Sequence, residues 1–304
     1  MDLSVVVPTL NARDRLAATL DALGAHAPDA EIVVVNGPSA DGTSGLVRDH
    51  SAVDVLLELS ERNVNAARNA GLAAATGDAL ALVGHASCVR EGWTDAVRDG
   101  LADADAVTGP VHRDVAGGHT TESVEHRRIR GREVTYFDGG NVAFTRDAIE
   151  ALDGFDEYLE TGAARDAAHR LAGMNRTVTW ESGMAVVRTD ADDVTHRVAA
   201  DPDVPLWGVK YRSLAYRLAK NYGVHPTVPY RIGRHAVTDA LAVARDVLTG
   251  DERPSEWAAN GRAVLQNTVR GARDGLAARR ADDPPRRNPN GISQRMDRTL
   301  ARYD

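Results

Sequence analysis

The sequence predicts an α/β fold in which a mostly parallel, doubly wound sheet is followed by a helical C-terminal extension. Two observations predict it. In the first half of the chain, short runs rich in Val and Ile alternate with helical patterns, and after about residue 205 helical periodicity replaces the strands. The runs are continuously apolar, which is typical of parallel strands covered on both faces. The 304 residues, 43% of them apolar, are enough to bury such a sheet.

Four strands are expected in the first part of the chain. The apolar runs that predict them are 3–7, 31–35, 53–59 and 79–83, and the helical patterns between them span 13–26, 41–50 and 63–76. A strand followed by a helix and a further strand is the usual unit of a parallel sheet. Ligands of such sheets bind at the carboxyl ends of the strands, so we expect the functional site there.

The segment 108–133 breaks this pattern. It is polar, contains several Gly and Arg residues and follows neither periodicity, so we expect a long loop or flap beside the site. A further strand is expected at 141–144, directly after Asp138-Gly139-Gly140. The paired glycines indicate a close backbone approach or a special turn at that point.

Helices are expected in the last third of the chain. Within 205–226, large apolar side chains recur every three or four positions, at Trp207, Tyr211, Leu214, Leu218 and Tyr222. Similar patterns cover 233–248 and 255–278, and the Pro-rich tail is expected to be irregular. We therefore divide the chain into an α/β domain over 1–204, a basic helical extension over 205–280 and an irregular tail over 281–304.

Charge is divided unevenly along the chain. The whole protein has a net charge of −8, whereas residues 206–304 hold 18 basic against 10 acidic side chains and are net +8. An anionic partner is expected for this third, either a membrane surface or nucleic acid. Because no nucleic-acid-binding motif accompanies the charge, we predict no nucleic acid. Lys occurs only at Lys210 and Lys220, and the Arg- and Asp-rich composition predicts a salt-adapted protein from a halophilic archaeon.

The compartment and a membrane contact are further expectations. Cys88 is the only cysteine, which excludes an internal disulfide and a zinc site built from cysteines. The first residues form a strand pattern rather than a signal peptide, and no run approaches the roughly 20 apolar residues of a membrane span, so we expect a cytoplasmic protein. The aromatic stripe of 205–226, with Lys210, Arg217 and Lys220, either seats the protein peripherally on the inner face of the membrane or packs on the α/β domain.

Four motifs occur in a fixed order. They are SVVVPTLN at 4–11, EIVVVNGPSADGT at 31–43, RNVNAARNAG at 62–71, and YFDGGNVAF followed by GFDE within 136–157. Together they resemble the family 2 glycosyltransferases, which have the GT-A fold, over residues 3–171. The resemblance implies transfer of a sugar, with inversion, from a nucleotide sugar to a glycan or a polyprenyl-phosphate-linked acceptor, in the assembly of surface glycans or glycoproteins.

The resemblance also implies binding residues. It places the nucleotide sugar against Pro8, Thr9, Asn11, Asn36, Asp41, Arg68, Gly139, Gly140 and Asn141. Arg68 would face the diphosphate or the acidic turn after the second strand, and the Gly139–Asn141 segment would border the sugar. Taken alone, Asp41 equally fits the N-cap of the helix that follows it.

Two departures from the family pattern concern the metal and the base. The family's D-x-D positions, whose carboxylates hold a divalent metal on the diphosphate, are Gly84 and Ala86 here, and neither side chain can bind Mg²⁺ or Mn²⁺. We therefore predict no metal-ligating side chain, and the sequence leaves open whether a metal binds through backbone and donor oxygens. The family's E-D pair, which supplies the base, is replaced by Ala163 and Ala164.

The candidate catalytic residues are Asp166, Arg165 and His85, with His169 and His196 as further candidates. Arg and His side chains would carry the diphosphate charge in place of a metal, and an acceptor phosphate, already anionic at neutral pH, would need no base. Two alternatives stay open. Asp166 also fits an ion pair with a basic side chain four residues later, and the whole chain also fits an inactive homologue that binds a nucleotide sugar or a partner protein.

Overall fold

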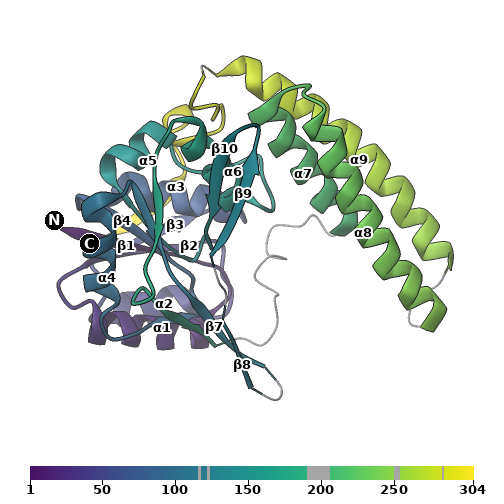
Figure 1. Ribbon diagram of the computed structural model, residues 1–304. Coiled ribbons are helices and arrows are strands. Elements are labelled where there is room, and N and C mark those ends of the chain that lie inside the picture. The colour runs from purple at the N-terminus through teal and green to yellow at the C-terminus, as the bar shows by residue number, and fades with distance from the viewer. Residues whose placement is uncertain (116–117, 122–123, 190–205, 250–253, 283) are drawn as a thin grey trace.

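The computed structural model describes residues 1–304 except 116–117, 122–123, 190–205, 250–253 and 283. Its centre is an eight-stranded sheet with the strand order β12-β6-β11-β4-β1-β2-β3-β14 (Figure 1). Helices cover the sheet on both faces, and the long C-terminal helices project away from it. The predicted fold class, a mostly parallel α/β sheet with a helical extension, is confirmed.

The first part of the chain forms the parallel core of the sheet. Its elements are β1 (Leu3–Thr9), α1 (Arg13–His26), β2 (Glu31–Asn36), α2 (Thr43–Asp49), β3 (Val55–Leu59), α3 (Val64–Ala74) and β4 (Ala79–Val83). β1 pairs in parallel with β2 and β4, and β2 pairs in parallel with β3. Every residue of β1 is buried, because this strand lies in the middle of the sheet with helices on both faces.

The next part of the chain adds a reversed strand beside β4. The elements here are β5 (Ser87–Val89), α4 (Trp93–Asp103), β6 (Ala106–Thr108), β11 (Asn141–Thr145), α5 (Arg146–Leu152), α6 (Ala163–Gly173) and β12 (Val178–Trp180). β11, the strand expected after Gly140, runs antiparallel between β4 and β6. The start of β11 therefore lies beside the end of β4, and Gly84 N donates to the carbonyl oxygen of Gly140 over 3.0 Å.

Apolar cores lie on the two faces of the sheet. One packs α1, α2 and α4 through side chains such as Leu16 and Trp93, and the other packs α3, α5 and α6. Gly71 lets α3 lie directly on β1, because a Cβ at this position would come within 2.3 Å of Cγ1 of Val6. A larger side chain there would push the helix off the sheet.

The segment 108–133 is not the loop that its composition predicts. It contains β7 (Val111–Val115), β8 (Gly118–Thr121), β9 (Glu125–Ile129) and the start of β10 (Arg132–Tyr136). β7 and β8 join β5 and β13 (Val186–Arg188) in a four-stranded sheet, whereas β9 and β10 form a hairpin whose turn residues Arg130 and Gly131 both have positive φ. The expectation of a loop was wrong because charged side chains cover the outer face of this hairpin and hide its few inward-facing apolar positions.

The helical extension consists of α7 (Leu206–Tyr222), α8 (Thr227–Thr249) and α9 (Pro254–Ala281). The apolar stripe predicted on α7 packs against the core of the α/β part, and its most buried members are Tyr211, Leu214, Leu218 and Tyr222. α9 lies closely along α7, and Gly275 allows this approach because it has no side chain. A Cβ on Gly275 would be only 2.3 Å from the backbone oxygen of Tyr216. Packing on the α/β part, one of the two roles left open for the stripe, is thus observed.

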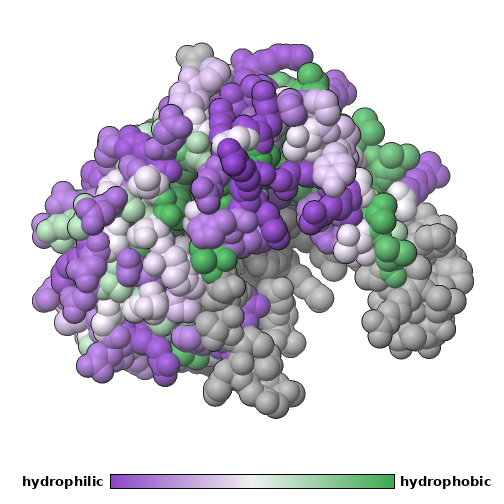
Figure 2. All heavy atoms as spheres, viewed as in Figure 1, coloured by the Kyte–Doolittle hydropathy of each residue, from purple (hydrophilic) through white to green (hydrophobic). Residues whose placement is uncertain are grey.

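Two of these helices carry exposed apolar side chains. On α8 and α9, five described large side chains are more than 60% exposed: Tyr230, Val237, Leu241, Leu265 and Val269. We call this set the α8–α9 apolar surface, and Figure 2 shows apolar side chains over the C-terminal helices. Within the described residues, every helix is too short or too polar to span a bilayer.

The tail, expected to be irregular, returns to the sheet. A short 3-10 helix covers Ile292–Gln294, and β14 (Thr299–Tyr303) pairs antiparallel with β3 at the edge of the sheet. Arg298 anchors this return, because its Nε donates to Oε1 of Glu157 over 2.5 Å and its side chain is buried. The strand gave no signal in the sequence, since most of its residues are exposed and none forms an apolar run.

Candidate active site

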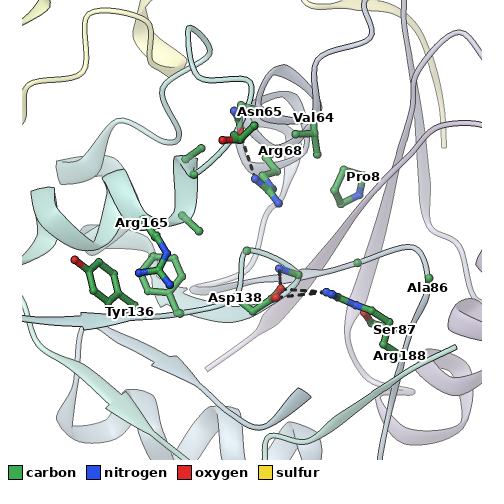
Figure 3. A pocket seen from close by; sticks show the side chains of 18 of the residues that line it. Pro8, Val64, Asn65, Arg68, Ala86, Ser87, Tyr136, Asp138, Arg165 and Arg188 are labelled. Atoms are coloured by element: carbon green, nitrogen blue, oxygen red, sulfur yellow. Dashed lines mark hydrogen bonds and ion pairs between the residues drawn. The ribbon is translucent and has the colours of Figure 1, made fainter. Parts of the chain in front are cut away.

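A cavity of about 470 Å³ opens at the carboxyl ends of β1 and β4, where a doubly wound sheet is expected to bind its ligand. The end of β1, the tip after β4 and the glycines before β11 line one part of it. The N-terminal ends of α3 and α6 and side chains from β10 and β13 line the rest (Figure 3). The predicted site residues that meet here are Pro8, Arg68, His85, Gly139, Gly140 and Arg165.

The tip that follows β4 is held by hydrogen bonds and carries no carboxylate. Gly84 N donates to the oxygen of Gly140, and Ser87 N donates to the oxygen of Gly84 over 2.9 Å. Nδ1 of His85 lies 3.4 Å from the carbonyl oxygen of Pro8, which ties the tip to the end of β1. Gly84 and Ala86, at the family's D-x-D positions, offer the cavity only backbone and a methyl group.

A divalent metal does not fit the side chains at this tip. Mg²⁺ and Mn²⁺ prefer carboxylate and other oxygen ligands. The residues that the structure describes contain no group of three His, Cys, Asp or Glu side chains that could hold an ion. Asp138, a carboxylate of the cavity, already accepts from Gly140 N over 2.7 Å and pairs with Arg188. We therefore derive no chemical step through a metal.

Two arginines follow the tip in the four-stranded sheet. Ser87 on β5 is in register with Arg188 on β13, and Arg188 is in register with Arg113 on β7. Both arginines line the cavity, and Nη2 of Arg188 lies 3.4 Å from Oδ2 of Asp138 (Figure 3). Sequence reasoning missed them, because Arg113 stands in the segment interpreted as a loop and Arg188 ends a strand of three residues.

Arg68 enters the cavity from α3. Its Nη1 donates to Oδ1 of Asn65 over 2.9 Å, and its guanidinium lies over the ring of Phe155. Nε of Arg68 is buried and has no hydrogen-bond partner among the described residues. Burial lowers the pKa of Arg68 to about 10, which leaves the group charged at neutral pH. Gly139 makes room for it, because a Cβ there would lie 2.8 Å from Nη2.

The N-terminal end of α6 forms the opposite wall. Ala163 and Ala164, which replace the family's acidic pair, line the cavity with methyl groups. Arg165 pairs with Glu125 over 2.7 Å and lies over the ring of Tyr136. Burial alone would raise the pKa of Glu125, but the hydrogen bond and charge of Arg165 bring it below its ordinary value. Arg165 is thus held in place by a carboxylate and an aromatic ring.

Glu160 is a carboxylate of the cavity that sequence reasoning passed over. It precedes α6, and one of its oxygens pairs with Arg212 of α7. Its Oε2 is buried and has no hydrogen-bond partner in the described part of the chain. Such an oxygen can accept a hydrogen bond or a proton from a ligand. The only signal in the sequence was its position, three residues before Ala163.

Asp166 does not line the cavity. Its side chain is fully buried, where it accepts hydrogen bonds from Arg170, Lys220 and Asn221, each over 2.8 Å. Burial alone would raise its pKa, but the charges of Lys220 and Arg170 lower it to about 2. The ion pair with Arg170, one of the two roles left open, is observed, and Asp166 is a positioning residue rather than a group that faces the cavity.

Three predicted nucleotide contacts build the loop after β2 instead of lining the cavity. Oδ1 of Asn11 accepts from the backbone of this loop, and Nδ2 of Asn36 donates to Oγ of Ser44. Asp41 accepts from the backbone N and Oγ1 of Thr43, at the start of α2. The N-cap of α2 is Gly42, so Asp41 is not the N-cap that the sequence also allowed, although it holds the first residue of the helix.

A smaller hollow of about 40 Å³ adjoins the cavity and shares Pro8, Val64 and His85 with it. Thr9 lines this hollow, and its Oγ1 is buried without a hydrogen-bond partner among the residues described. A ligand that fills the cavity and extends into the hollow can satisfy this hydroxyl.

The remaining candidates lie away from the cavity or outside the described residues. Asn141 is fully buried and accepts from Nε1 of Trp93 over 3.1 Å, which fixes the start of β11. His169 is buried with Nδ1 2.7 Å from the hydroxyl of Tyr222, and burial lowers its pKa well below the ordinary value. His196 lies outside the residues that the structure describes.

Comparison with known proteins agrees with this architecture. Residues 4–152 match the family model described as glycosyl transferase family 2. The mannosyltransferase PcManGT from Pyrobaculum calidifontis, solved with GDP-Man and Mn²⁺, is 19% identical, and the match covers 91% of this chain and 86% of that one with a TM-score of 0.55. TarS from S. aureus, solved with UDP-GlcNAc, is 16% identical, with 92% and 91% covered and a TM-score of 0.59. No curated protein matches the chain.

The fold and the site together define a glycosyltransferase with the GT-A fold. The match covers residues 4–152, so the α/β part of the chain is similar in sequence to glycosyl transferase family 2. The solved structures, each under 20% identical, support the fold.

Proposed function

We propose that the protein transfers a sugar from a nucleotide-sugar donor to an acceptor, with inversion at the anomeric carbon. The observation that supports this is the cavity itself, which joins Pro8 at the end of β1, the tip after β4 and the glycines before β11. These are the carboxyl ends of strands, where doubly wound sheets bind nucleotides.

The donor would lie along the cavity with its nucleoside toward the smaller hollow. Thr9 offers a buried hydroxyl on that side. Gly139 and Gly140 leave space for the sugar beside the tip after β4. Two solved structures of similar fold hold GDP-Man and UDP-GlcNAc, so these two donors are the first probes to use.

The proposed reaction exchanges one bond at the anomeric carbon of the sugar. An acceptor oxygen forms a bond to this carbon while the bond to the diphosphate oxygen breaks, and the electron pair of that bond stays on the diphosphate. A hydroxyl acceptor also loses its proton, and Oε2 of Glu160 is the group that would take it. Arg165 and His85 line the cavity and would stabilise the negative charge on the reacting oxygens.

For the acceptor, we propose a glycan or a polyprenyl-phosphate-linked molecule in the assembly of surface glycans or glycoproteins. A phosphate acceptor is already anionic at neutral pH and needs no base. A phosphate acceptor fits this wall of the cavity, because Ala163 and Ala164 offer no base and Arg165 offers a positive charge. With such an acceptor the reaction would not depend on Glu160, which distinguishes the two acceptor classes.

A contact with the membrane is part of the proposal, on α8 and α9 in place of α7. The tyrosines and Lys220 of α7 are buried and cannot reach a lipid surface. The α8–α9 apolar surface is exposed, and residues 206–304 carry a net charge of +8. An apolar helix face with surrounding positive charge fits an anionic membrane. We propose that the protein acts in the cytoplasm, at the inner face of the membrane.

Donor binding and turnover test the proposed function. Thermal unfolding is followed with UDP-, GDP- and dTDP-linked sugars, and at least one should raise the melting temperature. The same donor should release its nucleoside diphosphate slowly in water and faster with an acceptor. Stabilisation without any release would indicate the inactive homologue. A melting temperature that no nucleotide sugar changes would reject the proposed function.

A further inference from the structure

We propose that the protein binds the diphosphate of its donor with Arg68, Arg113 and Arg188 in place of a divalent cation. This inference rests on the proposed function, because it presupposes a donor with a diphosphate. The pairing of the carboxylates in the cavity, the positions of the arginines and the balance of charge support it.

Every carboxylate that lines the cavity has an arginine partner. Each of the three that line it is in an ion pair with an arginine: Glu125 with Arg165, Asp138 with Arg188, and Glu160 with Arg212. At the tip after β4, Gly84 and Ala86 add no side-chain oxygen. A divalent cation placed there would meet guanidinium groups of its own sign, and the repulsion between them would disfavour binding.

Arg188 and Arg113 lie directly behind this tip. The register Ser87–Arg188–Arg113 across β5, β13 and β7 places the two arginines side by side, in a row that starts three residues after Gly84. Side chains of in-register neighbours point to the same face of a sheet, and both of these line the cavity. The sheet therefore brings two positive groups to the place that the family gives to its metal.

Arg68 approaches from the other wall. Within the described residues, the hydrogen bond of Nη1 to Asn65 is the single one that its guanidinium makes, although the group has five N–H donors. Nη2 faces Gly139, where a Cβ would lie 2.8 Å away. Burial lowers the pKa of Arg68, because the charged guanidinium has lost water and gained few partners. An anion bound beside it would stabilise the charged form again. Phosphate oxygens are the acceptors that suit an arginine fork.

The balance of charge fits an anionic ligand. Four arginines line the cavity against three carboxylates, and Arg212 neutralises Glu160 from outside. When the bond to the sugar breaks, the electron pair adds one negative charge to the diphosphate. Guanidinium groups stay protonated throughout, so positioned arginines can stabilise this charge as a metal would.

Nucleotide binding in the absence of metal tests the inference. GDP, UDP and the corresponding monophosphates are titrated calorimetrically into the full chain, first with EDTA and then with Mn²⁺. We expect a diphosphate to bind in EDTA, with a Kd that Mn²⁺ changes by less than about threefold. Arg188→Met, which keeps the aliphatic stem, should weaken diphosphate binding by about tenfold or more and monophosphate binding by less than about threefold. The affinity of Arg188→Lys for the diphosphate should lie between those of the wild type and Arg188→Met.

Matched variants separate binding from folding. Arg176 is also a partly buried arginine with two ion pairs, to Asp105 and Asp147, but it lies outside the cavity. Arg176→Met should bind both nucleotides like the wild type. Circular dichroism shows whether each variant folds, and Arg68→Met reports on the second wall independently of Arg188.

The binding measurements distinguish failure of the arginine site from failure of the proposed function. Diphosphate binding in EDTA that Arg188→Met and Arg68→Met both weaken supports the inference. Binding that requires Mn²⁺, or wild-type binding by both variants, overturns the arginine site and leaves the proposed function standing. If no nucleotide binds in either solution, the proposed function itself fails, and this inference fails with it.

Discussion

The ammonium nitrogen of Lys220 lies 2.8 Å from Oδ2 of Asp166, and both side chains are fully buried. Lys220 stands on α7 and Asp166 on α6, so their ion pair joins the helical extension to the α/β part. Lys220 also lies 2.6 Å from Oδ2 of Asp156, which precedes α6. Because α6 begins at the wall of the cavity, this cluster holds that wall in position.

Removing the cation from this cluster should destabilise the protein strongly. Lys220→Met leaves Asp156 and Asp166 buried with too little positive charge, and breaking a buried ion pair costs about 3–5 kcal/mol. Urea unfolding at neutral pH measures the change in the free energy of unfolding. Lys210→Met is the control, because its ion pair with Asp239 is half exposed and should contribute less than about 1 kcal/mol. Equal losses in the two variants would contradict the role given to Lys220.

Stability should also fall in acid through Asp166. Burial opposes its charged form, but Lys220 and Arg170 lower the pKa of Asp166 to about 2 in the folded protein, below the ordinary 3.8. The carboxylate therefore stabilises the folded state above pH 3.8, and this contribution is lost as the pH falls toward about 2. Asp166→Asn should be less stable at pH 7 and should lose less stability over the same range. Parallel curves of unfolding free energy against pH would rule out this explanation.

Patterns in the sequence predicted the central strands closely, because these strands are apolar on both faces. β4, expected over 79–83, spans Ala79–Val83, and α1, expected over 13–26, spans Arg13–His26. β9 and β14 were missed, because most of their side chains are exposed and their pairing depends on a partner strand. Edge strands and hairpins of this kind leave little periodic signal in one sequence.

The site residues also divide into those that a local motif predicts and those that depend on a distant partner. Pro8, Arg68 and Gly139, which the resemblance places against the nucleotide sugar, line the cavity at the ends of the strands. Arg188 could not be found this way, since the register of β13 with β5 and β7 brings it to the cavity. For Asp166, the deciding partner is Lys220, more than fifty residues further along the chain.

Replacing the proposed base should stop transfer to a hydroxyl acceptor without affecting donor binding. Glu160→Gln keeps the size of the side chain but cannot take a proton at Oε2, and loss of a general base costs about 10²- to 10⁴-fold in rate. Donor Kd should stay within about twofold of wild type. The control is Glu133→Gln on the exposed side of β10. Full activity of Glu160→Gln would exclude Glu160 as the base and favour a phosphate acceptor.

A methyl group at Gly139 should weaken donor binding while the fold stays intact. The new Cβ would lie 2.8 Å from Nη2 of Arg68 and 3.3 Å from Cβ of Ala164, so the guanidinium must move. The end of an arginine can shift at little cost, and Gly139 has no positive φ that the variant would strain. We expect Gly139→Ala to unfold within about 1 kcal/mol of wild type and to bind nucleoside diphosphates about tenfold more weakly. Unchanged binding would show that Arg68 does not touch the diphosphate.

The α8–α9 apolar surface should carry the membrane contact. Val237→Ser with Leu241→Ser removes two apolar side chains that are 61% and 67% exposed, so the fold should not change while binding to vesicles weakens. Flotation with vesicles that contain anionic lipid should recover most of the wild type and much less of the double variant, with little of either on neutral vesicles. Val224→Ser is the control, because Val224 is 86% exposed but lies in the turn between α7 and α8. If the double variant floats like the wild type, the α8–α9 apolar surface makes no membrane contact. The positive charge of the extension then needs another partner.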